Sequence, residues 1–210
     1  MKTALYWEDA VAALHQNSAL SAVIRARPNI QLRSRGTAFA TLARAIVGQQ
    51  ISAKAAQSVW KRVVAACAQA RGASMNPDAV AALRVETLRA CGLSGMKVSY
   101  LHDLAAHFLD GRVQPRAFAR MDDEAIIEVL VAVKGIGRWS AQMFLMFHLL
   151  RPDVWPVDDL GLRNGIDLVW PQKKPRARTD YIKLGEQFVP WRSVACWYVW
   201  RALEPAPDDY

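Results

Sequence analysis

The amino-acid sequence predicts an all-helical protein. In nearly every segment of the 210 residues, apolar side chains recur at three- and four-residue spacing, which is the period of an amphipathic helix. Alternating apolar and polar residues, the pattern of a half-buried strand, do not extend over any length. The interruptions, such as RPN near residue 27 and GLSG near residue 92, are short and carry Gly or Pro. We therefore expect helices joined by short turns.

Residues 1–40 read as helices, and the first helix with a clear start signal follows them. The segment SAKAAQSVWKRVVAAC keeps its apolar side chains on one face, and Ser52 at its start is a residue type that caps helices. Asp122 is placed to cap the segment DEAIIEVLVAV, which again has one apolar face. The stretch from Arg138 to Leu149 is strongly apolar, so we expect a buried helix there.

The last third of the chain predicts further helices. Thr179 or Asp180 is expected to open one of them, and the segment WRSVACWYVWRAL forms the last. The segment PQKKPRAR near residue 171 is basic and carries proline, so it predicts a surface loop. That loop either contacts phosphate or is only a solvated charged turn.

The charge balance points to an anionic partner. Lys plus Arg number 27 against 19 Asp plus Glu, which gives a formal net charge of +8 and a pI near 9.7. Such an excess favours nucleic acid as the partner, with a membrane surface second. Solubility alone is the simpler explanation of the charge.

The spacing of the cysteines and histidines along the chain does not match that of a metal-binding motif. Cys67, Cys91 and Cys196 are scattered, lie in apolar settings and lack metal-ligand spacing, and an odd number argues against a disulfide framework. We expect His148, in MFLMFHLL, to be a core histidine. None of the four histidines falls in an HExxH pattern; they are His15, His102, His107 and His148. The sequence predicts no metal and no cofactor.

The chain has no segment that indicates export or membrane insertion. The first residues, MKTALYWEDAVAAL, carry charge within their apolar run, unlike a signal peptide. No window approaches the roughly 18 unbroken apolar residues that a membrane span needs. We expect a soluble protein of the cytoplasm, associated with the nucleoid through DNA binding if the source is bacterial.

The segment KGIGRW, residues 134–139, predicts a tight turn between two helices. Glycine at positions 135 and 137 allows positive φ and close backbone approach. The second helix then presents N–H groups with partial positive charge, which suit a phosphate oxygen. The flanking side chains of Lys134 and Arg138 add to that attraction. The candidate phosphate-binding residues are Lys134, Gly135, Ile136, Gly137 and Arg138. A purely structural turn is the alternative.

Two adjacent carboxylates follow this turn in RPDVWPVDDLGLRNGI. Asp158 and Asp159 precede a helix-like segment, and Asp is a preferred helix cap. In a basic protein, however, an acidic pair close to a phosphate-binding turn repels the DNA backbone. We therefore infer that the pair faces something positive.

These segments, in this order, resemble the helix-hairpin-helix (HhH-GPD) DNA glycosylase superfamily, in particular its DNA-3-methyladenine glycosylase II branch. The likeness runs from Leu42 to about Asn164, with a further piece near the C-terminus. Its matching pieces are LARAIVGQQIS, LRACGLSGMKVSYLHDLA, LVAVKGIGRWSAQMFLMF, WPVDDLGLRNGI and PWRSVACWYVW.

The resemblance implies one compact monomeric unit over residues 1–210, made of two helical lobes with a cleft between them. One lobe is about residues 42–150 and carries the hairpin; the other is about residues 1–41 plus 151–210. The family's essential aspartate matches Asp159. Asp158 would then cap the helix or support its neighbour, and an alignment shifted by one residue would exchange the two.

The resemblance also assigns two tryptophans to a base pocket. Bifunctional members of the superfamily carry a lysine nucleophile where this chain has Trp139, so we expect hydrolysis without strand cleavage. An indole also attracts a cationic base, by about 0.5–2 kcal/mol. Trp200 matches a second aromatic residue of the pocket, and core packing is the alternative for both. The endonuclease III-like branch has a four-cysteine iron–sulfur site, which cannot form with Cys196 alone.

Gln49 and Gln50 follow the helix LARAIVG at a turn. In the superfamily this place supplies side chains that enter the duplex where the target base has left, which offsets part of the unstacking cost of a few kcal/mol. The match puts Gln50 at the wedge. A polar helix terminus is the alternative.

The expected function is a monofunctional glycosylase that releases alkylated bases, 3-methyladenine and 7-methylpurines, from double-stranded DNA and so initiates base excision repair. One alternative is a non-catalytic helix-hairpin-helix module. Asp159 with Trp139 distinguishes the two, because a binding module needs no carboxylate at the sugar. The other alternative is a sibling glycosylase for a neutral lesion, which needs a leaving-group acid that the sequence does not offer.

Overall fold

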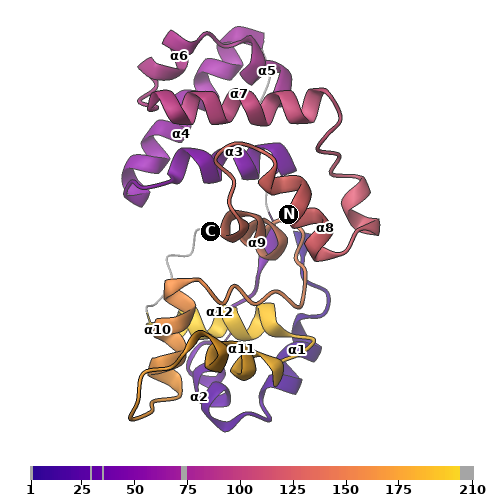
Figure 1. Cartoon of the computed structure of the whole chain (residues 1–210), viewed down its shortest axis with the longest axis vertical. Coiled ribbons are helices and arrows are strands. Elements are labelled where there is room, and N and C mark those ends of the chain that lie inside the picture. Colours follow the sequence, from indigo (N-terminus) through magenta and orange to yellow (C-terminus); the bar gives the residue numbers. More distant parts are fainter. Residues whose placement is uncertain (1, 29, 35, 72–74, 204–210) are drawn as a thin grey trace. The chain divides into compact units, whose positions relative to one another are not determined.

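The computed structural model describes residues 2–28, 30–34, 36–71 and 75–203. In this part of the chain the structure contains twelve α-helices, a short 3-10 helix and one pair of two-residue strands (Figure 1). The prediction of an all-helical fold is confirmed. None of the described helices is long and apolar enough to cross a membrane.

The chain separates into two compact units. The hairpin unit is Gly36–Ala141, and the terminal unit is Met1–Arg35 together with Gln142–Tyr210. The boundary near residue 141 falls within one helix, so that helix begins in the hairpin unit and continues in the terminal unit. The cleft that the sequence analysis expects between two lobes stays a prediction.

In the described part of the hairpin unit, every regular element is a helix. Five of its helices begin after a side chain whose oxygen accepts a backbone N–H three residues further on, and these caps are Thr37, Ser52, Asn76, Ser94 and Asp122. The caps predicted at Ser52 and Asp122 are therefore confirmed. Its helices are α3 (Ala38–Gly48), α4 (Ala53–Arg71), α5 (Pro77–Ala82), α6 (Val85–Ala90), α7 (Gly95–Leu109), η1 (Ala117–Arg120), α8 (Asp123–Val131) and the start of α9 (Arg138–Phe147).

Helix α7 lies at the centre of the hairpin unit and packs against α3, α5 and α6. Burying one large aliphatic side chain contributes roughly 1.5–3 kcal/mol, so this core is the main source of the unit's stability. Its fully buried large side chains include Leu42, Ile46, Leu88, Leu101, Leu104, Phe118, Ile126 and Leu130. The central helix therefore gives a fixed platform to the turns that surround it.

The terminal unit is built around α12 (Arg192–Leu203), which packs against α10, α2 and α1. Residues 193–199 of α12 are all buried, and a helix that is apolar on every side belongs in the middle of a unit. Its other elements are β1 (Lys2–Thr3), α1 (Trp7–Leu14), α2 (Ser18–Ala26), β2 (Arg33–Ser34), the rest of α9, α10 (Leu160–Val169) and α11 (Arg178–Glu186). The packing of α10 on α12 decides where the acidic pair lies.

Several local predictions are wrong in detail. Residues 1–40 contain, besides helices, the strands β1 and β2, which pair antiparallel with Lys2 opposite Ser34. Helix α9 ends at Phe147 rather than at Leu149. Helix α11 begins at Arg178 after Ala177, and Asp180 lies in its first turn, where its carboxylate accepts the Ala177 N–H at 2.8 Å.

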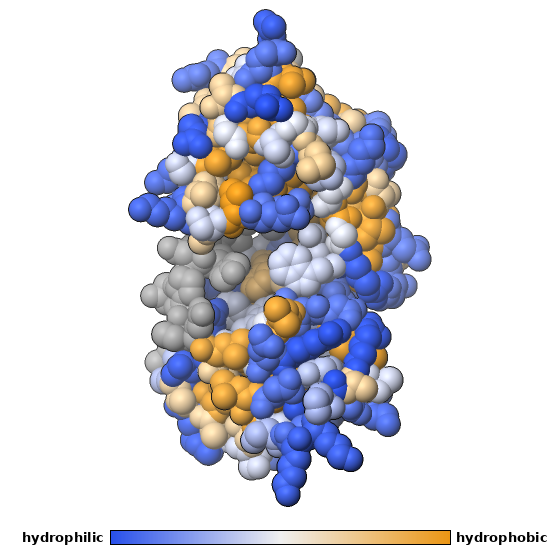
Figure 2. Space-filling view, turned by 60° about the vertical axis from the view of Figure 1, so that its left-hand side comes forward, coloured by the Kyte–Doolittle hydropathy of each residue, from blue (hydrophilic) through white to orange (hydrophobic). Residues whose placement is uncertain are grey.

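His148 was expected in the core but is partly exposed, and its ring stacks on Phe144 at 4.8 Å. Elsewhere, hydrophilic residues cover much of the face of each unit that Figure 2 displays, with apolar patches between them. The exposed large apolar side chains include those of Trp139 and Leu160.

Candidate functional site

The hairpin between α8 and α9 is closed by a glycine that no other residue can replace without strain. Gly135 has φ +82°, in the left-handed region that L side chains rarely adopt. A Cβ added there would lie 2.2 Å from the ring of Tyr100 on α7. Ile136 is buried beside this glycine. The hairpin therefore rests directly on α7.

The second glycine of the hairpin is used differently from the prediction. Gly137 does not adopt positive φ, and a Cβ added there would meet no atom within 4 Å. Its carbonyl accepts the Ala141 N–H at 3.0 Å, so Gly137 stands at the start of α9. The protein's own packing does not require a glycine here. Its lack of a side chain leaves the first turn of α9 open to an approaching group, such as a phosphate.

Asp103 on α7 fixes the other end of the hairpin. Its Oδ2 accepts the backbone N–H of Lys134 at 2.8 Å, and its Oδ1 lies 3.8 Å from the Lys134 Nζ. The Lys134 side chain remains largely exposed. The sequence analysis missed Asp103, because the partner is a backbone N–H 31 residues away and a single sequence carries no signal for such a bond.

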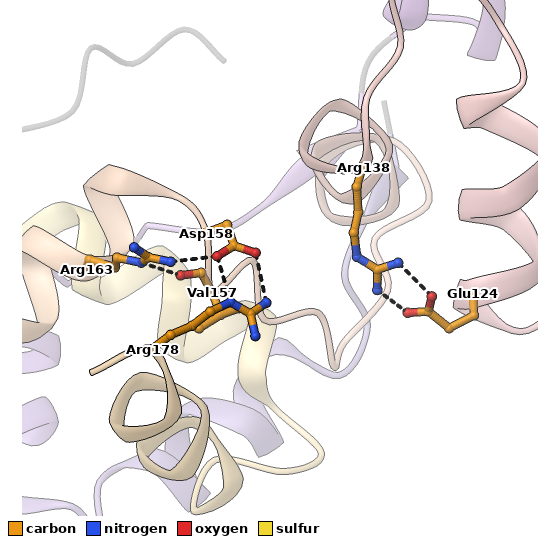
Figure 3. Close-up of polar contacts among 6 residues, drawn as sticks. All are labelled: Glu124, Arg138, Val157, Asp158, Arg163 and Arg178. Atoms are coloured by element: carbon orange, nitrogen blue, oxygen red, sulfur yellow. Dashed lines mark hydrogen bonds and ion pairs between the residues drawn. The ribbon is translucent and has the colours of Figure 1, made fainter. Parts of the chain in front are cut away.

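Arg138 forms a two-pronged ion pair with Glu124 at the start of α8 (Figure 3). The guanidinium donates to the two carboxylate oxygens at 2.8 and 2.5 Å. This hydrogen bonding lowers the pKa of Glu124. The sequence analysis predicted that Arg138 attracts phosphate, and Glu124 is a competitor for its guanidinium that the pattern did not reveal.

The turn between α3 and α4 is attached to the hairpin. The side chain of Gln49 donates to the carbonyl of Gly135 at 2.8 Å. Lys97 on α7 donates to the carbonyls of Val47 and Gln49 at 2.8 and 2.7 Å, and burial lowers the pKa of its amine. Gln49 is thus engaged within the protein.

Gln50 and Trp139 are two further exposed candidates of the hairpin unit. Gln50 has φ +56°, a left-handed conformation that costs a non-glycine residue about 1–2 kcal/mol. Its side chain is exposed. Strained exposed residues of this kind cluster at functional sites. Trp139, in the first turn of α9, is 51% exposed and so is not a core residue of this unit.

In the terminal unit, Asp159 is the N-cap of α10. Its Oδ1 accepts the backbone N–H of Leu162 at 2.6 Å and the indole N–H of Trp200 at 2.8 Å. A Cβ on Gly161 would lie 3.1 Å from this oxygen and 3.2 Å from the indole nitrogen, so a glycine gives these groups room to meet. The two donors hold a half-buried carboxylate in one orientation.

Trp200 belongs to a group of aromatic side chains. Its ring stacks on Phe147 with centroids 5.9 Å apart and meets Trp197 edge-on at 6.5 Å. The Arg201 guanidinium lies 3.8 Å from the centroid of the Trp197 ring. Asp159 is therefore bonded to one member of an aromatic group, and aromatic rings attract flat cationic ligands.

Asp158 does not cap α10, since Asp159 takes that role. Its exposed carboxylate instead accepts hydrogen bonds from Arg178 at 2.9 Å and from Arg163 at 2.6 Å (Figure 3). The bonds from Arg178, and then its charge and that of Arg163, lower the pKa of Asp158. The expectation that the pair faces positive charge holds for Asp158, and both arginines escaped the sequence analysis.

The described residues offer no group of three or more His, Cys, Asp or Glu side chains that could hold a metal ion. Cys67, Cys91 and Cys196 are free and buried. Burial, followed by the charge of Asp159, raises the pKa of the Cys196 thiol. Cys196 is thus a packing residue of α12 that lies within the electrostatic reach of Asp159.

The fold is helical, a glycine hairpin precedes α9, and the carboxylate of Asp159 caps α10. These features are those of a helix-hairpin-helix protein. Residues 43–187 match the family described as HhH-GPD superfamily base excision DNA repair protein, and the chain belongs to this family. The resemblance identified from the sequence motifs is therefore confirmed.

Named relatives and solved structures agree with this family. The chain is 34% identical over 185 residues to DNA-3-methyladenine glycosylase 1 of Schizosaccharomyces pombe, covering 88% of this chain and 79% of the relative. It is 29% identical to DNA-3-methyladenine glycosylase 2 of Escherichia coli, covering 92% of this chain and 67% of the relative.

Two solved structures are similar along nearly the whole chain. A DNA-3-methyladenine glycosidase from Bacillus halodurans has a TM-score of 0.85 and 31% identity, covering 100% of this chain and 96% of that one. A 3-methyladenine DNA glycosylase from Schizosaccharomyces pombe in complex with abasic DNA has a TM-score of 0.75 and 30% identity, with coverages of 92% and 95%.

Proposed function

We propose that the protein is a monofunctional DNA glycosylase that hydrolyses the N-glycosidic bond of alkylated bases, 3-methyladenine and 7-methylpurines, in duplex DNA. The observation that carries the proposal is the Asp159 carboxylate, held by Leu162 and Trp200 beside an aromatic group. The names of the relatives support the alkylated-base specificity. Removal of the base would begin base excision repair.

The carboxylate suits the charge that develops during this reaction. Breaking the bond between base and deoxyribose builds positive charge on the sugar, as in glycoside hydrolysis generally. A preorganised carboxylate stabilises that oxocarbenium character and orients the attacking water. Because the Asp159 carboxylate is already oriented by hydrogen bonds, it needs little reorganisation when the transition state forms. A purine methylated at N3 or N7 is already cationic, so it leaves without a second carboxylic acid.

The proposal includes hydrolysis without strand cleavage. Strand cleavage by a lyase mechanism needs an amine that forms a Schiff base with the sugar. This chain has Trp139 at the position where the resemblance expects that lysine. In this proposal the indole of Trp139, which is 51% exposed, stacks on the extruded base.

The DNA duplex is bound, in this proposal, through its backbone at the start of α9. The open approach at Gly137 and the exposed Lys134 side chain both favour a phosphate oxygen there. Gln50 enters the duplex as the wedge, and its left-handed backbone sets the direction of the side chain. Because such binding releases counterions, affinity should fall steeply with salt.

The proposal also covers the oligomeric state, the location and the cofactor requirement of the protein. We take the protein to be a monomer of the cytoplasm that uses no cofactor. In a non-catalytic DNA-binding module Asp159 would serve only as the cap of α10, and that role accounts for its bond to Leu162 but not for its bond to Trp200. A glycosylase for a neutral lesion needs an acid for the leaving base, and the carboxylate nearest in sequence, Asp158, is engaged by two arginines.

The experiment that tests the proposal measures released bases and strand breaks together. Methylated duplex DNA is incubated with the protein, and free bases are separated by chromatography. A labelled duplex with one lesion is run on a denaturing gel with and without alkali. The proposal expects free 3-methyladenine and 7-methylguanine, with strand breaks only after alkali. Binding without base release would favour the non-catalytic module, and breaks without alkali would contradict the absence of lyase activity.

A further inference from the structure

We propose that Arg163 and Asp158, together with Arg178, are positioning residues that hold Asp159 in place. This inference rests on the proposed catalytic role of Asp159. The sequence analysis expected Asp158 either to cap the helix or to support its neighbour, and it singled out neither Arg163 nor Arg178. Their contacts converge on the backbone immediately before α10, which is where Asp159 has to be fixed (Figure 3).

Arg163 reaches back over the start of its own helix. Its backbone N–H donates to the Asp159 carbonyl at 3.1 Å, which is an ordinary bond of the first turn. Its side chain donates to the Val157 carbonyl at 2.7 Å and to Asp158 Oδ1 at 2.6 Å. One residue therefore bonds to three successive positions, 157, 158 and 159. Such bridging restricts the backbone that carries the Asp159 side chain.

Asp158 receives a second arginine from α11. Arg178 donates to both of its oxygens at 2.9 Å, the two-pronged geometry in which guanidinium and carboxylate fit best. The segment before α10 is therefore attached both to α10, through Arg163, and to α11, through Arg178. A single exposed ion pair contributes little, but these bonds share one carboxylate and form a network.

The Arg163 guanidinium is supported from α11 as well. It lies 5.5 Å from the centroid of the Tyr181 ring, and the Tyr181 hydroxyl donates to Asp167 on α10 at 2.8 Å. Arg163 is also less exposed than Arg178, with 31% against 56% of its side chain accessible. Of the two arginines, Arg163 is thus the more firmly held and the more important for positioning.

The same arrangement explains why two aspartates stand side by side. The carboxylate of Asp158 binds Arg163 and Arg178, and the carboxylate of Asp159 is oriented by Leu162 and Trp200.

The test uses the Trp200 indole as a reporter that does not depend on activity. Its N–H signal is recorded by NMR in protein with isotope-labelled tryptophan, and it is assigned among the eight tryptophans with a Trp200→Phe variant. The test variants are Arg163→Met, Arg163→Lys and Asp158→Asn. Lys183→Met is the control, because it removes one exposed charge from α11 at a residue other than Arg178, the α11 side chain that bonds to Asp158.

We expect the Trp200 indole signal to move in Arg163→Met and Asp158→Asn and to stay in place in Lys183→Met. The rate of base release in a single turnover should fall about tenfold in Arg163→Met, since small misplacements of a catalytic group are costly. The affinity for the same DNA should change less than about threefold, because Arg163 holds a catalytic group rather than the phosphate backbone. Arg163→Lys should recover only part of the rate, because lysine lacks the planar fork.

An unmoved indole signal in a folded Arg163→Met variant would overturn the positioning role, and so would a full rate in that variant. If the wild-type protein releases no base, the proposed function fails. The indole signal still reports whether Asp158 and Arg163 hold Asp159. The two failures are therefore distinguishable.

Discussion

The indole nitrogen of Trp200 donates a hydrogen bond to Asp159 Oδ1 at 2.8 Å, although 41 residues separate them along the chain. The bond connects the buried helix α12 to the start of α10, the helix that packs most extensively on it. Trp200 thus contacts the carboxylate through its N–H, in addition to the base-pocket role that the resemblance predicts for its ring. In the sequence analysis Trp200 was only a pocket aromatic or a core residue.

Replacing Trp200 by Phe should separate these two roles. The phenyl ring keeps the stacking on Phe147 but cannot donate to Asp159. A hydrogen bond to a charged group is worth about 1.5–3 kcal/mol, so we expect the thermal midpoint to fall by several degrees and base release by the folded variant to slow at least tenfold. Single-turnover kinetics would measure this. Trp170→Phe is the control, since Trp170 packs on Phe188 away from this bond, and equal rates in both variants would refute the role of the N–H.

The two hairpin glycines should respond differently to alanine. Gly135→Ala should destabilise the protein by more than about 2 kcal/mol, because positive φ alone costs about 1–2 kcal/mol and the Cβ meets the Tyr100 ring. Gly137→Ala should leave the stability unchanged but weaken DNA binding, because its Cβ lies in open space where we propose that phosphate approaches. Urea denaturation and fluorescence anisotropy with duplex DNA check both. Unchanged DNA affinity in Gly137→Ala would argue against the hairpin as the phosphate site.

Releasing Arg138 from Glu124 should strengthen DNA binding. In Glu124→Gln the arginine loses its carboxylate partner, and we expect the Kd for duplex DNA to fall about threefold, with little change in stability because the pair is exposed. Glu128→Gln makes the same charge change on α8, where Glu128 is exposed and does not contact Arg138. Anisotropy titrations at several salt concentrations compare the two. If both variants bind alike, only the net charge matters and the pair has no role in binding.

The left-handed backbone of Gln50 lowers the stability of the protein, and we propose that its side chain is needed for base release. Gln50→Gly relieves the left-handed strain at φ +56° and should stabilise the protein by about 1 kcal/mol, while base release falls because the side chain is lost. Gln50→Ala loses the side chain but keeps the strain, so it should lower base release without the gain in stability. Thermal unfolding and base-release assays on the same samples measure the two effects. A fully active Gln50→Gly variant would exclude the wedge.

Acid should remove the contribution of Asp158 to stability. Its pKa is lowered in the folded protein by Arg178 and Arg163, so its contribution is present above the unfolded value near 4 and disappears as pH falls through the lower folded value. Because Asp158 is exposed, this contribution should be below about 1 kcal/mol. The stability difference between the wild type and Asp158→Asn should therefore shrink from pH 5 toward about pH 3 in urea denaturation. A difference that grows over this range would contradict the sign.

Local signals in the sequence were enough to predict the helices and their caps. Ser52 and Asp122 cap the helices expected of them, because a cap depends on residues within three positions. Ala177 was not predictable in this way. The N–H of Ala177 is bound by the carboxylate of Asp180, which lies within the first turn of the helix. The residue whose side chain forms the cap is therefore not the residue at which the helix starts.

The candidate site was predictable where motifs carry it and not where distant residues meet. The order of the hairpin and the acidic pair was readable, and the resemblance named Asp159. The contacts of Asp103 with Lys134 and of Arg178 with Asp158 join residues that are 31 and 20 positions apart. Only the packing of α7 and α11 brings these side chains to their partners. The sequence also could not show that Gly135 adopts positive φ and Gly137 does not, because both positions carry the same residue type in the same turn.

The central claim is that Asp159 performs the chemistry, and it is tested most directly by the rate of base release from Asp159→Asn. Asparagine caps a helix as well as aspartate does and its oxygen still accepts Leu162 and Trp200, so the fold should survive. We predict that Asp159→Asn binds methylated duplex DNA but releases no 3-methyladenine above background, whereas Asp158→Asn keeps part of the wild-type rate. An active Asp159→Asn variant, or an inactive Asp158→Asn beside it, would contradict this account.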